Sequence, residues 1–176
     1  MKTRGKLLLV LLAALILLYF VYVEGIFNVV SFENGLEKLS AIDQEFELEG
    51  KLVPAQKEKI SQYNTKLVDL ETELSKKTSN EDIKALNYLI DARKELVLMQ
   101  LNLIEFQETR ECSRQLELID SIMSSAVSAR DSVQNYLTNY SSFSDKTTEW
   151  NQNVLDTTNS VELSFRELQE SISQTC

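Results

Sequence analysis

The side chains that usually perform acid–base and nucleophilic chemistry are sparse in this chain. Histidine is absent from its 176 residues, so the commonest general base near neutral pH and the commonest metal ligand are missing. The two cysteines, Cys112 and Cys176, are too few for a four-ligand zinc site of soft donors. Four glycines leave no glycine-rich loop for phosphate groups. The composition therefore predicts a protein that is not an enzyme and that holds neither a metal nor a cofactor.

A short series of carboxylates superficially resembles a metal cluster. Glu105, Glu108 and Glu111 follow one another at three-residue spacing, which places them near one face of a helix. Di-iron helical bundles also need a Glu-x-x-His motif on two helices, and the chain has no histidine. Arg110 and Arg114 lie among these acids. We therefore interpret the series as a surface ion-pair network.

The charge distribution argues against nucleic-acid binding. The chain has a net charge of −9. Its first 23 residues contain three basic side chains and no acid, so the remainder carries −12. A body this acidic repels a phosphate backbone. We expect protein partners or solvent at its surface, and no nucleic acid.

An apolar run near the N-terminus predicts a membrane anchor. Residues 7–23 are apolar without interruption, about the minimum length for a spanning helix. The basic residues 1–6 predict a cytoplasmic tail, and residues 24–33 an extended juxtamembrane segment. This interpretation makes membrane lipid a partner of residues 7–23, and the protein a single-pass one with an extracytoplasmic body. A cleaved signal peptide is the alternative.

The rest of the chain predicts an all-α fold. Apolar residues recur at helical spacing over residues 34–77, 80–141 and 144–175, which predicts a long antiparallel up-down-up helical bundle or coiled coil in one domain, residues 34–176. Gly50 and Pro54 interrupt the first helix. The apolar phase continues across them, which favours a kink over a reversal of the chain, although the reversal remains open.

Antiparallel helices pair residues whose numbers add to a constant set by the turn. A turn near residues 77–80 predicts a constant near 157, which pairs Leu67 with Ile90 and Leu74 with Ile83. A turn at Ser144 predicts a constant near 288, which pairs Arg130 with Thr158.

The second constant also pairs the two cysteines. Cys112 and Cys176 fall on the same apolar stripes as their neighbours, and disulfides persist in exported proteins. We therefore predict a Cys112–Cys176 disulfide. The alternative is two unrelated cysteines.

A second apolar stripe lies on the middle helix, well away from the stripe that faces the first helix. A two-helix hairpin cannot bury both stripes, so the second is a candidate interface for a homo-oligomer or a protein partner. The alternative is that residues 34–49 fold back and cover it. The stripe consists of Leu89, Ala92, Leu96, Met99, Leu103 and Phe106.

These features predict the general class of protein but not a particular partner or process. We expect a membrane-anchored extracytoplasmic helical stalk that acts as a structural or protein-interaction module without catalysis. A sensory or ligand-binding helical bundle and a holdase-like chaperone are the alternatives. The holdase would need exposed apolar surface, for which the second stripe is the candidate.

Overall fold

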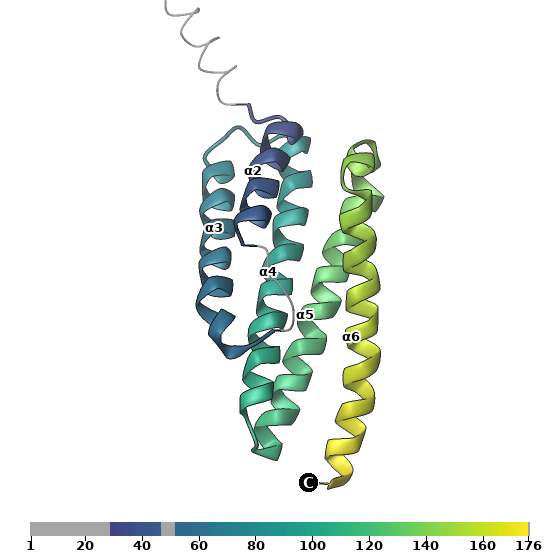
Figure 1. Ribbon diagram of the computed structural model, residues 1–176. Coiled ribbons are helices and arrows are strands. Elements are labelled where there is room, and N and C mark those ends of the chain that lie inside the picture. Colours follow the sequence, from purple (N-terminus) through teal and green to yellow (C-terminus); the bar gives the residue numbers. More distant parts are fainter. Residues whose placement is uncertain (1–28, 47–51, 176) are drawn as a thin grey trace, which may run out of the picture.

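The computed structural model describes residues 29–46 and 52–175. These residues form five α-helices and two short 3₁₀ helices, so the prediction of an all-α helical bundle is confirmed. The elements are α2 (Phe32–Glu45), η1 (Pro54–Gln56), α3 (Lys57–Ser75), α4 (Glu81–Glu108), α5 (Cys112–Asn139), η2 (Ser141–Lys146) and α6 (Thr148–Thr175). Figure 1 shows that they run alternately down and up along one bundle, with α2 beside α3 and α4.

The chain reverses between α2 and α3, so the favoured kink within residues 34–77 is wrong. Asp43 on α2 contacts Tyr63 on α3, and Lys38 contacts Glu73, a pattern that only antiparallel helices produce. The residue before a proline is restricted to extended conformations, and Val53 has φ −133° and ψ 154°. A helix entering from α2 therefore cannot continue through Val53. Gly50 lies outside the described residues.

A second reversal divides the predicted helix 80–141 into α4 and α5, so the three-helix up-down-up prediction is also wrong. Thr109 and Glu111, which flank the turn, both have extended backbone angles. Gln115 donates a hydrogen bond to the carbonyl of Thr109 at 3.1 Å, and Arg114 on α5 pairs with Glu105 on α4 at 2.7 Å. The reversal brings α5 against the second apolar face of α4, which a straight helix would have left in water.

The helices that the two turns were predicted to pair also lie together in the structure. Leu67, Leu74, Ile83 and Ile90 are all buried in one cluster between α3 and α4. On the other side of the bundle, Arg130 on α5 donates a hydrogen bond to Asn159 on α6 at 3.1 Å, one position from the predicted partner. The α4 helix begins after Asn80, whose side chain caps it by accepting a hydrogen bond from the Ile83 amide at 2.9 Å.

α2 lies parallel to α4 in a fixed register of 50 residues. The Phe32 amide donates to Asp82, the Asn80 side chain donates to the Val30 carbonyl, and Arg93 binds Asp43. Each contact joins residues 50 positions apart. Of the predicted extended segment 24–33, residues 24–28 lie outside the described residues, whereas Phe32 and Glu33 already belong to α2. The Ser31 side chain begins this helix by accepting a hydrogen bond from the Asn34 amide.

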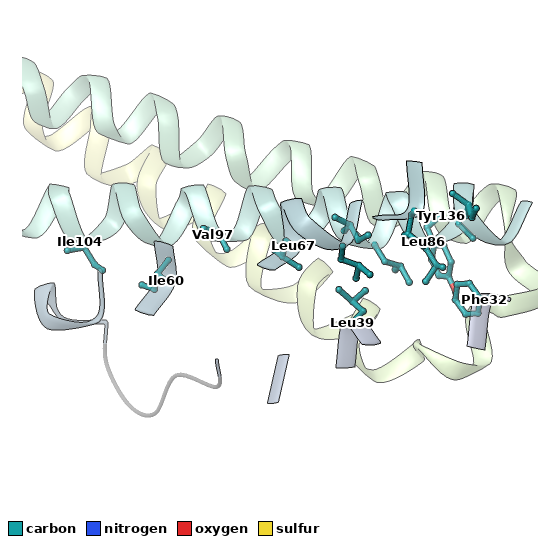
Figure 2. Close-up of a cluster of buried hydrophobic side chains, with 14 residues drawn as sticks. Phe32, Leu39, Ile60, Leu67, Leu86, Val97, Ile104 and Tyr136 are labelled. Carbon is teal, nitrogen blue, oxygen red and sulfur yellow. The ribbon is translucent and has the colours of Figure 1, made fainter. Parts of the chain in front are cut away.

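The largest core cluster runs lengthwise between α2, α3 and α4. Figure 2 shows it extending from Ile60 and Ile104 at one end to Phe32 and Tyr136 at the other. The Phe32 ring stacks on Phe143 with centroids 4.5 Å apart. Burying side chains of this size stabilises the fold by about 1.5–3 kcal/mol each.

A glycine permits the close approach of α2 to α4. A Cβ atom at position 35 would overlap Cδ1 of Leu86 and lie 3.0 Å from its Cδ2. Leu86 is fully buried, so its side chain would have to shift among packed neighbours to make room. Gly35 therefore sets how closely the two helices pack.

The predicted single-pass localisation, with a cytoplasmic N-terminus and an extracytoplasmic body, is contradicted. Across residues 29–46 and 52–175, no helix is long and apolar enough to cross a membrane, because charged side chains repeatedly interrupt the apolar positions. The predicted tail, residues 1–6, and the predicted span, residues 7–23, lie outside the described residues.

Candidate functional site

The second apolar stripe, predicted as an interface, lies inside the bundle. Leu89 and Ala92 are fully buried and Met99 is 4% exposed. Leu96, Leu103 and Phe106 are half-buried and pack against apolar side chains of α5 and α6. The expectation of an uncovered surface assumed that the middle helix runs straight to residue 141. Because the chain reverses after α4, its own helices cover the stripe.

The structure describes only one of the two cysteines of the predicted disulfide. Cys112 is the first residue of α5, and no free cysteine is found among the described residues. Cys176 lies outside them. The Cys112–Cys176 bridge therefore stays a prediction.

A buried polar cluster joins four helices, and sequence reasoning missed it. Arg93 on α4 donates to both oxygens of Asp43 on α2, with the closest contact at 2.7 Å. The Tyr63 hydroxyl on α3 donates to the same carboxylate at 2.6 Å. The guanidinium carbon lies 3.8 Å from the ring centre of Trp150 on α6, in a cation–π arrangement. We call Asp43, Tyr63, Arg93 and Trp150 the Arg93 cluster.

The electrostatics of the Arg93 cluster suit a structural role. The Arg93 side chain is 5% exposed and that of Asp43 31%. Burial raises the pKa of Tyr63 well above the usual tyrosine value, with Arg93 opposing and the Asp43 carboxylate adding to the shift. The phenol therefore keeps its proton, and both carboxylate oxygens of Asp43 accept hydrogen bonds. These groups fasten α2, α3 and α6 to α4 and offer no reactive atom.

A signal for this cluster was present in the sequence. Arg93 lies four residues from both Leu89 and Val97 and so interrupts an apolar stripe on α4, as Arg130 interrupts the stripe on α5. Arg130 is only partly buried, however, and binds Glu162 at 2.6 Å at the edge of the α5–α6 seam. A charged residue within a core stripe indicates a partner but does not identify it.

Comparisons of the chain with protein-family models, with curated proteins and with solved structures find no match. Function must therefore be inferred from the geometry of this chain alone.

Two of the grooves on the surface of the described residues differ clearly in the chemistry of their lining. The first, of about 470 Å³, follows the seam between α5 and α6 and is called the seam groove. Its lining consists of Met123, Ser124, Val127, Ser128, Glu162, Arg166 and Gln169. The second, of about 320 Å³, lies on the outer face of α4 and is called the α4 groove. Its lining consists of Lys84, Asn87, Tyr88, Asp91 and Tyr140.

The two grooves differ in chemistry. The seam groove has thioether and aliphatic side chains, Met123 and Val127, with a rim of charged and amide groups. The α4 groove has two phenol rings, a carboxylate and an amide, and the rings of Tyr88 and Tyr140 lie 5.9 Å apart at 46°.

Proposed function

We propose that this chain is a non-catalytic protein-interaction module and that it binds an amphipathic helix of another protein along the seam groove. The observation that carries this proposal is the incomplete burial of α6. Its buried residues are Asn151, Val154 and Thr158, all in the first half of the helix. Beyond Thr158 the apolar stripe continues, but its members are only half-buried: Val161, Phe165, Leu168 and Ile172.

The seam groove suits a helix better than an extended strand. It lies between two antiparallel helices, and a third helix placed there would pack its apolar face on Met123 and Val127. Helix-in-groove recognition uses anchors at i, i+3, i+4 and i+7, a spacing that the half-buried stripe of α6 itself follows.

Charge favours a basic partner over a second copy of this chain. α6 carries five acidic side chains and one basic one, and the whole chain has a net charge of −9. Two such surfaces repel each other, whereas a helix with lysine or arginine beside its apolar face complements them. The partner is therefore expected to be an amphipathic helix with basic flanks.

Two synthetic helical peptides with the same leucine pattern test the proposal, one with lysine flanks and one with glutamate flanks. Fluorescence anisotropy with the full chain should detect binding of the lysine peptide and at least tenfold weaker binding of the glutamate peptide. Val127→Lys should weaken binding, while Leu98→Lys should not, because Leu98 lies on α4 and is 45% exposed. Circular dichroism verifies that both variants fold.

Several outcomes would refute this function. Equal binding of both peptides would show that the groove does not prefer a helix with basic flanks. Binding unaffected by Val127→Lys would place the site elsewhere. A dimer of the unliganded chain in sedimentation experiments, abolished by Val127→Lys, would assign the groove to a second copy.

A further inference from the structure

The α4 groove has an arrangement that the proposed interaction along α5 and α6 does not use. Four of its five lining residues, Lys84, Asn87, Tyr88 and Asp91, follow one another at spacings of three, one and three, so they lie on one face of α4. Tyr140, the residue that follows the last residue of α5, closes one side. Only the reversal between α4 and α5 brings this tyrosine to α4.

One hydrogen-bond acceptor in this groove is unused. The Oδ1 atom of Asn87 is shielded from solvent and has no hydrogen-bond partner among the described residues. Shielded side-chain oxygens in folded proteins normally have a partner. Asn87 lines the groove, so a turn of its side chain would present this unpaired oxygen to a bound molecule as a hydrogen-bond acceptor.

A second acceptor, the Asp91 carboxylate, lies one helical turn from Asn87. Its nearest cation is Lys94, with Nζ 3.7 Å away, and Lys94 is held more closely by Glu71 at 2.9 Å. Burial raises the pKa of Asp91, opposed by Lys94 and assisted by the nearby Glu71 charge. The carboxylate is thus incompletely compensated, and a bound cation would stabilise its charged form.

The positive charge that lines the groove is already neutralised. The ammonium group of Lys84 binds Glu81 at 2.8 Å, which leaves acids in excess around the groove: Glu71, Glu81 and Asp91 against Lys84 and Lys94. The groove therefore offers acceptors and negative charge beside two aromatic faces. A protonated amine can use all of these, because it donates hydrogen bonds and is attracted by aromatic faces.

From this arrangement we infer that the α4 groove binds a small organic cation, a protonated amine attached to an aromatic or apolar body. The amine donates to Asn87 Oδ1 and Asp91, and the body lies against Tyr88 and Tyr140. A volume of about 320 Å³ is at the lower end for ligand sites, so the ligand is small. An anion is excluded by the Asp91 carboxylate, and a neutral analogue forgoes the ion pair.

Three probes of one shape test this inference on the full chain: phenethylamine, 2-phenylethanol and phenylacetate. Amide NMR spectra should show saturable shifts centred on Asn87 and Asp91 with phenethylamine, at least tenfold weaker binding of 2-phenylethanol, and no binding of phenylacetate. Asp91→Asn should weaken phenethylamine binding at least tenfold and leave 2-phenylethanol unchanged. Glu95→Gln is the matched control, because it removes one charge from the same helix outside the groove.

The remaining outcomes overturn the inference. Absence of phenethylamine binding would do so directly. Equal binding of the amine and the alcohol, or equal losses in Asp91→Asn and Glu95→Gln, would show that no specific charge recognition occurs. Tyr140→Leu separates the aromatic contribution: it should weaken the amine and the alcohol alike, and unchanged binding would remove Tyr140 from the site. These results are independent of the peptide experiments on the seam groove.

Discussion

Removing the carboxylate of Asp43 is expected to destabilise the protein far more than removing an exposed carboxylate that also holds α2 in the bundle. Breaking a fully buried ion pair by deleting one partner costs about 3–5 kcal/mol. Asp43 is 31% exposed, whereas Arg93 is 5% exposed. In Asp43→Ala, Arg93 retains its bond to the Leu89 carbonyl and its contact with Trp150. We therefore expect a loss of about 2–3 kcal/mol, which lowers the melting temperature by about 4–12 °C.

The assay is urea unfolding followed by far-ultraviolet circular dichroism. Glu73→Ala is the control, because its partner Lys38 also joins α2 to α3, with side chains 46% and 53% exposed. Exposed pairs contribute about 0.2–1 kcal/mol. A double-mutant cycle with Arg93→Met should give a coupling of at least about 1 kcal/mol.

This prediction also tests the reversal between α2 and α3. If residues 34–77 formed one kinked helix, Asp43 would lie far from Arg93. Asp43→Ala would then cost no more than Glu73→Ala, and the cycle would show no coupling. Either result would refute the packing of α2 on α4.

Three further predictions concern packing and pH. Gly35→Ala should lower the unfolding free energy by about 1–3 kcal/mol in urea titrations, because the new Cβ overlaps buried Leu86; a more stable protein, as helix propensity alone would give, would contradict this contact. Ala92→Leu should lower it by a similar amount, since Ala92 is fully buried beside Ala129, and a neutral effect would mean that the second stripe is exposed after all. Burial raises the pKa of Tyr63 in the folded state, so its contribution to stability is full below the unfolded value of about 10 and is lost as pH rises above it. Tyr63→Phe should therefore show a shallower loss of stability than the parent above that pH, and parallel curves would refute the assignment.

The registers that the sequence predicted are those fixed by local turns. Leu67 with Ile90 follows from a turn whose position the polar residues 76–80 indicate. The α5–α6 register follows in the same way from the serines at 141, 142 and 144, which the structure forms into η2. Two antiparallel helices joined by a short connection can differ only in how far one is shifted along the other. The position of the turn and the two apolar stripes therefore determine their register.

The missed reversal had no local signal. Residues 108–112 contain neither glycine nor proline, and each is acceptable within a helix. The turn forms there because α4 has apolar residues on two faces, and doubling back buries the second one. That preference depends on the whole of α4 and α5. At Pro54 the apolar spacing wrongly predicted a continuous helix. The spacing continues across the proline because α2 and α3 both place their apolar residues against α4.

The candidate sites were hidden for the same reason. The spacing of Lys84, Asn87, Tyr88 and Asp91 is visible in the sequence, but the approach of Tyr140 requires the α4–α5 reversal. The Arg93–Asp43 pair likewise requires α2 and α4 to be parallel. Contacts between parallel helices obey a constant difference in residue number, and nothing in the local sequence sets that difference.

The register of 50 residues between α2 and α4 has a consequence for synthesis. α2 emerges from the ribosome before the helix on which it packs, and at about 5–20 residues per second the partner positions follow about 3–10 s later. During that interval Phe32 and Leu39, which are almost fully buried in the finished protein, lack the α4 surface that covers them. The α4–α5 hairpin has a short connection and closes soon after it is made. Among the described helices α2 is therefore the first to be made, yet it cannot dock until α4 has followed, and it is the segment that a chaperone acting on the nascent chain would hold.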